Sequence, residues 1–301
     1  MSQKQEPELS YTHRWMLAIR PKTLPAAAAP VFLGWGLAAG IRAFHWGPAL
    51  AALAGALLIQ IGTNLVNDVI DFSKGADNEG RLGPTRATQA GWLTVRQMWQ
   101  GVFASFGAAV LAGVYLAWVA GWPVIVIGLA SLIAGTLYTA GPFAFAYNGL
   151  GDLFVMIFFG FVAVCGTVFV IAQQVPSGAW WAALAAGALT VNILAVNNIR
   201  DIESDRAAGR RNIPVLWGRG AGEAEYALML LLAYLALPML VFAGYASYWV
   251  FLAALTLPDA WKLWRLLRSG ISGTALNPLL GKTAQHLLRY SVLLAIGLGL
   301  G

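Results

Sequence analysis

Three carboxylates close a long apolar stretch of the sequence and are the residues best suited to chemistry. Asp68, Asp71 and Asp77 follow a run in which the seventeen residues before Asn64 carry no charge. A charged side chain within a membrane helix costs about 2.5–3.5 kcal/mol, so such groups usually mark a functional site. In a helix, Asn64, Asn67 and Asp71 recur at i, i+3 and i+7, which places an amide–carboxylate stripe on one face.

A second polar cluster follows a predicted helix at 178–199. Its members are Asn197, Asn198, Arg200, Asp201 and Asp205. Asn197, Asp201 and Asp205 recur every four residues and again share one helical face. The pattern Asn-x-x-x-Asp therefore occurs twice, about 130 residues apart, each time at the end of an even-numbered span. This favours a weak internal repeat of a four-helix unit.

Two acidic clusters on facing helices repel each other and need cations. Carboxylate and amide oxygens in this number suit Mg²⁺, which typically bridges one or two carboxylates to substrate phosphates. Basic side chains near the clusters would bind the outer oxygens of a diphosphate. The candidates are Lys22, Lys74, Arg81, Arg86, Arg200, Arg206, Arg210 and Arg211. A neutralised diphosphate is a good leaving group, so the pattern predicts ionisation of an alkyl, preferably allylic, diphosphate in a bundle that excludes water.

The composition places these clusters in an integral membrane protein. Of the 301 residues, 59% are hydrophobic and only 11% are charged, whereas soluble domains carry about 25% charged residues. Helices of about 20 residues leave room for roughly nine spans in a single all-α domain over residues 1–301. The predicted spans are 24–42, 47–67, 99–119, 122–139, 152–173, 178–199, 224–243, 246–267 and 284–301.

The basic residues predict the orientation of the chain in the membrane. Eighteen of the nineteen Lys and Arg residues lie in or beside the longer segments between the spans. Those segments are 1–23, 68–98, 140–151, 200–223 and 268–283. Cytoplasmic loops are enriched in Lys and Arg, so we expect a cytoplasmic N-terminal segment 1–23, without a signal peptide, and the C-terminus outside. The net charge of +6 then reflects topology and anionic lipid rather than nucleic-acid binding.

A cation-coupled transporter is the alternative from another class of protein. Its coupling ions would bind carboxylates within the membrane. All thirteen acidic residues instead lie toward the predicted cytoplasmic side, and none lies at the middle of a predicted span. Two clusters with matched spacing therefore favour a metal–diphosphate site.

The motifs resemble those of the UbiA superfamily of intramembrane prenyltransferases. The resemblance rests on Asn67-Asp68-x-x-Asp71 with Asp77, and on Asp201-x-x-x-Asp205. It continues in Arg20-Pro-Lys22, Arg81 to Arg86, Tyr138-Thr-Ala-Gly-Pro142, Tyr147 to Asp152, and Asn197 to Arg211. Within the superfamily, Asp71-Phe-x-x-Gly-Ala-Asp77 and Gly83-Pro-x-Arg86 are most similar to the 1,4-dihydroxy-2-naphthoate prenyltransferases.

This resemblance implies a UbiA-type bundle of about nine helices, with the active site under cytoplasmic loops at 68–98 and 200–223. The implied Mg²⁺ ligands are Asn67, Asp68, Asp71, Asp201 and Asp205, and the four aspartates would be the catalytic residues. The diphosphate-binding candidates are Lys22, Lys74, Arg86, Arg200, Arg206 and Arg210. Arg210 and Asn212 stand where Lys and Thr are common in related sequences. The candidates for the acceptor or prenyl site are Asn64, Asp77, Tyr138, Tyr147, Asp152, Asn197 and Asn198. For Tyr138, Tyr147 and Asp152, interfacial tyrosines and a helix cap are an equal alternative.

The implied reaction begins with Mg²⁺-assisted ionisation of a polyprenyl diphosphate. An electron-rich carbon of 1,4-dihydroxy-2-naphthoate then attacks, and loss of CO₂ and a proton gives a demethylmenaquinone. Other acceptors of the superfamily stay open, namely 4-hydroxybenzoate, homogentisate, chlorophyllide, haem or a glycerol phosphate lipid. The implied location is the inner membrane of a bacterial cell, with the active site facing the cytoplasm.

Overall fold

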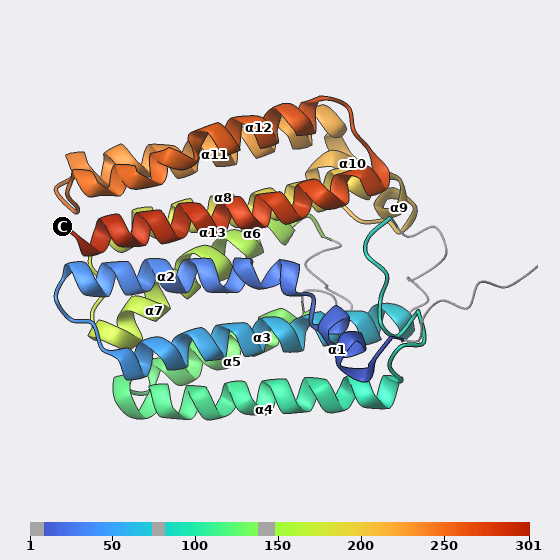
Figure 1. The fold of residues 1–301 in the computed structure, drawn as a ribbon, viewed down its shortest axis with the longest axis horizontal. Coiled ribbons are helices and arrows are strands. Elements are labelled where there is room, and N and C mark those ends of the chain that lie inside the picture. The colour runs from blue at the N-terminus through green and yellow to red at the C-terminus, as the bar shows by residue number, and fades with distance from the viewer. Residues whose placement is uncertain (1–8, 74–81, 138–147) are drawn as a thin grey trace, which may run out of the picture.

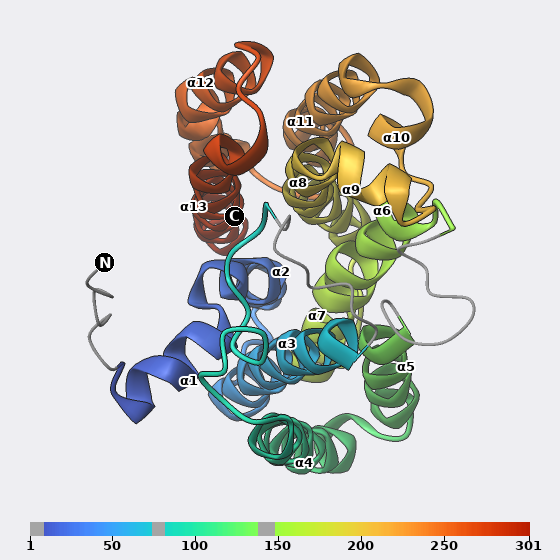
Figure 2. The ribbon, with the colours of Figure 1, turned by 90° about the vertical axis from the view of Figure 1, so that its right-hand side faces the viewer.

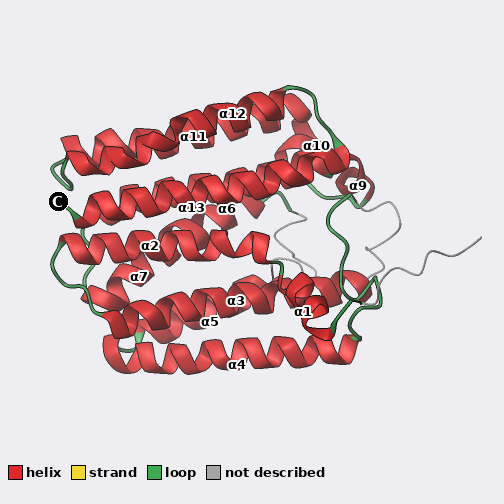
Figure 3. Cartoon of the chain, in the orientation of Figure 1, coloured by secondary structure: helices red, strands yellow, loops and turns green. Residues whose placement is uncertain are grey.

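The protein, described here by a computed structural model over residues 9–73, 82–137 and 148–301, is a bundle of helices without a strand in these ranges (Figure 3). Within the described residues, each predicted span coincides with a helix or an unbroken run of helices. Six of these are long and apolar enough to cross a membrane. The prediction of an all-α, multi-pass membrane protein is therefore confirmed.

The helices have these bounds in chain order: α1 (Tyr11–Ile19), η1 (Pro21–Thr23), α2 (Leu24–Gly40), α3 (Trp46–Ser73), α4 (Val95–Ala120), α5 (Pro123–Leu137), α6 (Gly151–Val155), η3 (Met156–Val162), α7 (Ala163–Ala172), α8 (Gly178–Arg200), α9 (Ile202–Ala207), α10 (Ile213–Trp217), α11 (Arg219–Phe242), η4 (Tyr248–Thr256), α12 (Leu257–Arg268), η5 (Gly273–Leu276) and α13 (Asn277–Gly299). The six candidate spans are α1 to α2, α3, α4, α6 to α7, α8 and α11.

The long helices run side by side, and the short helices α1, α9 and α10 gather at one end, opposite the C-terminus (Figure 1). Seen from that end, the helices surround a central region into which the segment before α4 reaches (Figure 2). Helix α8 lies innermost: 72% of its most apolar window is buried, against 22% for α4. Alanine and other small residues dominate the buried face of α8 and allow this close packing.

Helix α3 is longer than the sequence predicted, and this length places the first acidic cluster. Its 28 residues span about 42 Å at 1.5 Å per residue, against about 30 Å for the hydrocarbon core of a bilayer. No Gly or Pro interrupts residues 63–74, so the helix continues past the predicted end at 67. Asp68 and Asp71 therefore lie on its last turns, together with Asn67, rather than in the loop predicted at 68–98.

Two segments depart from α-helical geometry where the sequence predicted continuous helices. Residues Met156–Val162 form a π-helix and Tyr248–Thr256 a 3₁₀-helix. In the π-helix, a Cβ on Gly160 would lie 2.6 Å from the carbonyl oxygen of Ala183 and 2.9 Å from Cα of Gly187. The altered winding thus brings two backbones into direct contact, which hydrophobic periodicity alone does not reveal.

Helices α2 and α13 approach so closely that Gly36 tolerates no side chain. A Cβ on Gly36 would lie 2.3 Å from the carbonyl oxygen and 2.5 Å from Cα of Ala295. Both atoms belong to the backbone, so neither can rotate away.

We expect Gly36→Ala to lower the free energy of unfolding by about 1–3 kcal/mol through overpacking, although Ala is the better helix former by about 0.5–1 kcal/mol. Gly113→Ala in α4 is the matched control, because a Cβ there meets nothing within 4 Å. Thermal unfolding in detergent, followed by size exclusion, measures both variants. Equal midpoints for the two would contradict the close approach.

Candidate active site

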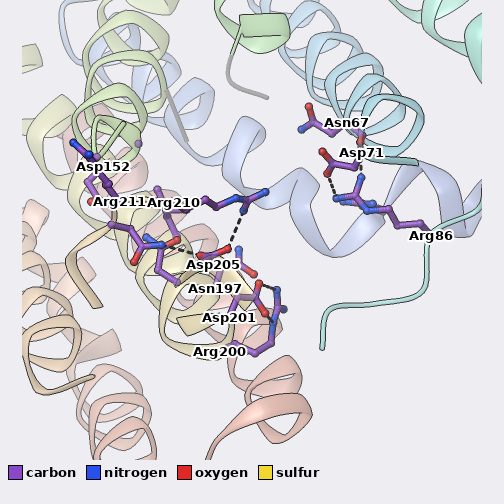
Figure 4. A pocket seen from close by; sticks show the side chains of 16 residues that line it. Asn67, Asp71, Arg86, Asp152, Asn197, Arg200, Asp201, Asp205, Arg210 and Arg211 are labelled. Carbon is purple, nitrogen blue, oxygen red and sulfur yellow. Dashed lines mark hydrogen bonds and ion pairs between the residues drawn. The ribbon is translucent and has the colours of Figure 1, made fainter. Parts of the chain in front are cut away.

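A polar cavity opens at the end of the bundle where the short helices lie. Sixteen residues line it (Figure 4), and they come from α3, α6, α8, α9 and the segments around them. They are Arg20, Asn67, Asp71, Arg86, Gly149, Gly151, Asp152, Leu194, Asn197, Asn198, Arg200, Asp201, Asp205, Arg210, Arg211 and Asn212. Its volume is about 210 Å³, below the roughly 300–1,000 Å³ of pockets that enclose a whole drug-sized ligand. The cavity therefore accommodates polar head groups rather than a complete lipid chain.

The last turns of α3 form one wall of the cavity. Arg86 forms an ion pair with Asp71 through Oδ2 and also donates to the main-chain carbonyl of Asn67. Both side chains of the ion pair are nearly buried. Asp71 Oδ1 is buried and accepts no hydrogen bond from the described residues. One oxygen of Asp71 is thus neutralised by arginine, while the other has unused capacity for a cation.

Asp68 lies on the same turn but behind this wall. Its Oδ2 accepts a hydrogen bond of 3.0 Å from the main-chain N–H of Ala87, and its Oδ1 accepts one of 3.2 Å from that of Thr88. Arg20 also approaches Asp68 Oδ2 at 3.8 Å. Both oxygens are therefore engaged, and Asp68 does not line the cavity. The expectation that Asp68 is a metal ligand stays a prediction; in the structure the segment that carries Arg86 folds over this one carboxylate.

The second cluster forms the facing wall, at the junction of α8 and α9. Arg200 donates two hydrogen bonds to Asp201, from Nε to Oδ1 at 2.8 Å and from Nη2 to Oδ2 at 2.6 Å. Arg210 lies 3.2 Å from Asp205 Oδ1. The two pairs place two arginines and two carboxylates on this wall (Figure 4).

Asp205 is held from two sides. Asn212 donates to its Oδ2 at 2.8 Å, and the same Asn212 caps α10 by accepting from the N–H of Val215 at 3.0 Å. Burial raises the pKa of the Asp205 carboxyl above its ordinary value; Arg210 opposes the shift and Asp201 adds to it. The hydrogen bond from Asn212 and the ion pair with Arg210 both depend on the folding of α9 and α10. These short helices therefore set the electrostatic environment of Asp205.

Asn277, the first residue of α13, connects the two walls. Its Oδ1 accepts a bond of 2.8 Å from Nη1 of Arg200, and its Nδ2 donates to the carbonyl of Leu82 at 3.0 Å. Leu82 begins the described part of the segment that carries Arg86. One amide side chain thus joins the Arg200–Asp201 pair to the segment that holds the Arg86–Asp71 pair.

Most of the site residues predicted from the sequence meet at the cavity. These are Asn67, Asp71, Arg86, Asp152, Asn197, Asn198, Arg200, Asp201, Asp205 and Arg210.

Three further candidates do not line the cavity. Asn64 donates to the carbonyl of Ile19 and to Thr23 Oγ1, at 2.9 Å each, and so ties α3 to the N-terminal segment. Lys22 is exposed on η1, and the exposed Arg206 pairs with Glu203. Lys74, Asp77, Tyr138 and Tyr147 lie outside the described residues.

Arg211, a candidate for binding the outer oxygens of a diphosphate, also lines the cavity. Sequence reasoning assigned no role to four residues that complete the site. They are Arg20, Asn212, Asn277 and Glu225. Arg20 enters the cavity because the chain turns sharply between α1 and η1, with φ of 57° at this residue. Glu225, on α11, is buried, interacts electrostatically with Asp152 and has an Oε2 atom without a hydrogen-bond partner among the described residues. A carboxylate in the first turns of a predicted span was the available signal for Glu225.

The donor atoms suit a hard cation held jointly with a substrate. Among the described residues, no three His, Cys, Asp or Glu side chains gather into a metal-binding group of their own. Mg²⁺ does not require one, because it usually takes one or two carboxylates and completes its shell with water and substrate phosphates. The unpartnered Oδ1 of Asp71 and the carboxylates across the cavity supply oxygen ligands of this kind.

Comparison with known proteins shows which family the chain belongs to. The sequence model of the UbiA prenyltransferase family matches residues 27–274. The 1,4-dihydroxy-2-naphthoate octaprenyltransferase of Escherichia coli (strain K12) is 33% identical over 299 residues, 97% of either chain. The apo structure of a UbiA homolog from Aeropyrum pernix K1 gives a TM-score of 0.68 at 18% identity, over 91% of this chain and 96% of that one. A UbiA homolog from Archaeoglobus fulgidus bound to DMAPP and Mg²⁺ gives 0.58 at 15% identity, over 94% and 99%.

The family and the relatives predicted from the sequence motifs are thus confirmed, and the fold agrees with them. The chain is an integral, multi-pass membrane protein and belongs to the UbiA prenyltransferase family.

Proposed function

We propose that this protein transfers a polyprenyl group from an allylic polyprenyl diphosphate to 1,4-dihydroxy-2-naphthoate. The products are diphosphate, CO₂ and a demethylmenaquinone, formed in its reduced state, as a step of menaquinone biosynthesis. The observation that carries the proposal is a cavity in which two acid–arginine clusters, on α3 and on α8–α9, face each other. The relative that matches 97% of this chain bears the name of this activity, which supports the choice of acceptor.

Mg²⁺, when bound, would neutralise the diphosphate and make it a better leaving group. We assign its protein ligands to Asn67, Asp71, Asp201 and Asp205, which line the cavity. Asp68 receives a different role, because both its oxygens accept main-chain hydrogen bonds. It anchors the segment that carries Arg86 and acts on catalysis through that segment.

The cavity arginines bind the diphosphate by exchanging partners. Arg86, Arg200 and Arg210 each hold a carboxylate. Guanidinium groups bind carboxylate and phosphate oxygens with the same forked geometry. With Mg²⁺ held by these carboxylates, the arginines would be available to the phosphate oxygens, so that no buried charge would be left unpaired.

The bond between the allylic carbon and the diphosphate oxygen breaks with its electron pair on the diphosphate. The acceptor ring supplies the electron pair for the new carbon–carbon bond and loses CO₂. The apolar bundle protects the allylic cation from water. Small buried residues of α8 make this interior dense and dry.

The membrane arrangement follows from the distribution of charge. Eighteen of the nineteen Lys and Arg residues lie in or beside the longer sequence segments between the predicted spans, Arg42 being the other, and the cavity lies at the end of the bundle where the short helices gather. By the positive-inside rule this end faces the cytoplasm, in the bacterial inner membrane, and the C-terminus lies outside. The chain then forms one domain of nine transmembrane segments, in which η4 with α12, α5 and α13 complete the six candidate spans.

Replacing one carboxylate on either wall tests the two-cluster site. We expect Asp71→Ala and Asp201→Ala each to lower turnover at least about 100-fold, the scale of losing one group that stabilises the transition state. The assay supplies Mg²⁺, a labelled polyprenyl diphosphate and 1,4-dihydroxy-2-naphthoate to membranes that contain the protein. Asp259→Ala is the control, since this exposed carboxylate pairs with Arg289 outside the cavity. Wild-type activity in either cavity variant would rule out the proposal, and prenylation of another candidate acceptor in its place would correct the acceptor.

Removing the amide of Asn277 tests the connection between the walls. We expect Asn277→Ala to raise KM for the prenyl diphosphate by roughly tenfold, as for the loss of a hydrogen bond to a charged group, because Arg200 loses one partner and Leu82 another. The thermal midpoint of the bundle should change little, since Asn277 lies at a helix end. An unchanged donor KM would show that the walls hold their positions without this bridge.

A further inference from the structure

Four arginines around the cavity each stand beside a carboxylate. The pairs are Arg20 with Asp68, Arg86 with Asp71, Arg200 with Asp201 and Arg210 with Asp205. Two cavity residues, Arg211 and Asp152, have no such ion pair among the described residues. Within the described ranges, Arg211 makes no ion pair or side-chain hydrogen bond, and Asp152 makes no ion pair. The Oδ1 atom of Asp152 is buried and has no hydrogen-bond partner there.

These two residues enter the cavity from the same wall. Gly149, with φ of 74°, packs against the main chain of Arg211: a Cβ there would lie 2.9 Å from its carbonyl oxygen and 4.0 Å from its Cβ. Asp152 follows three residues later, in the first turn of α6. Asp152 and Arg211 lie across the cavity from Asp71 and Arg86 (Figure 4).

A diphosphate is a poor partner for this wall. Its oxygens would meet the carboxylate of Asp152, which has no cation beside it, and like charges repel in a buried site. Glu225 lies close enough to interact electrostatically with Asp152 and also has a buried oxygen without a partner among the described residues.

A ligand that offers an anionic group and a hydroxyl donor side by side satisfies both residues. Arginine binds a carboxylate with paired, charge-assisted bonds, and a carboxylate accepts a hydrogen bond from a phenolic hydroxyl. We propose that Arg211 and Asp152 form the acceptor subsite: Arg211 binds the carboxylate of a hydroxyaryl acid, and Asp152 accepts the hydrogen bond of its hydroxyl. The proposal rests on the proposed function and names the residues that would hold its acceptor.

Steady-state kinetics separate this subsite from the diphosphate site. We expect Arg211→Gln to raise KM for 1,4-dihydroxy-2-naphthoate by roughly 10- to 100-fold, the loss of a hydrogen-bonded charge pair, with donor KM within about twofold of wild type. Arg211→Lys should recover part of the loss, because the charge remains. Arg96→Gln, at an exposed arginine of α4, is the control and should leave both constants unchanged. A rise in donor KM alone, or no change, would overturn the assignment of Arg211.

Equilibrium binding gives a readout that needs no turnover. The probes are 1-hydroxy-2-naphthoate, 1-naphthol and 2-naphthoate, titrated against tryptophan fluorescence with Mg²⁺ and a polyprenyl thiodiphosphate present. Wild type should prefer 1-hydroxy-2-naphthoate to 1-naphthol by about tenfold or more, and Arg211→Gln should remove this preference. Asp152→Ala should weaken both hydroxyl-bearing probes and spare 2-naphthoate.

Each negative result has a separate meaning. The subsite would be overturned if the wild-type protein did not prefer 1-hydroxy-2-naphthoate to 1-naphthol. It would also be overturned if the Asp152→Ala variant bound all three probes as tightly as the wild-type protein does. If the wild-type protein prefers probes with the carboxylate and with the hydroxyl but does not prenylate 1,4-dihydroxy-2-naphthoate, the subsite stands and the proposed function is wrong.

Discussion

Carboxylates at the edge of a membrane bundle need a cation close by, and this requirement organises the polar end of the molecule. A buried charge without a partner costs several kcal/mol, and Asp68, Asp71 and Asp205 are all buried. Arginines from four separate segments supply the partners. Arg20, Arg86 and Arg210 lie outside the long helices, whereas Arg200 is the last residue of α8. Ion pairing thus adds to hydrophobic packing in positioning the segments that line the cavity.

The remaining helices serve this arrangement through their lengths and ends. Helix α3 extends beyond the hydrocarbon layer, so its acidic turns reach the cavity. Helix α13 begins at Asn277, which binds both Arg200 and the carbonyl of Leu82. The same helix packs against α2 over backbone contacts at Gly36. The last helix of the chain thus closes the bundle against the first long one and, at its other end, holds the two walls of the site together.

The sequence predicted the helices and both clusters because each depends on local spacing. Asn67 and Asp71, like Asn197 and Asp201, are four residues apart, and a helix places such pairs on one face whatever surrounds them. The different environments of Asp68 and Asp71 did not follow from spacing. These two residues of one turn of α3 have different neighbours because residues 86–88 fold over Asp68. Arg20 and Asn277 were missed for a related reason, since a sharp turn and a contact 195 residues away in sequence leave no periodic signal. The π-helix at Met156–Val162 escaped because its residues are as apolar as those of an α-helix.

The pairing of charges also bears on how the substrates of the proposed reaction enter. A divalent cation alone would compete with Arg86, Arg200 and Arg210 for their carboxylates, whereas a diphosphate alone would compete with the carboxylates for these arginines. Either event leaves buried charges of one sign uncompensated, which is costly. Binding of the cation and the diphosphate together would replace the Arg86–Asp71, Arg200–Asp201 and Arg210–Asp205 pairs and leave none of these charges uncompensated. On the proposed function, the resting ion pairs therefore couple the binding of metal and prenyl donor and disfavour either alone. Arg211 and Asp152 stand outside this exchange, so the wall they share is free to bind a ligand of different charge pattern.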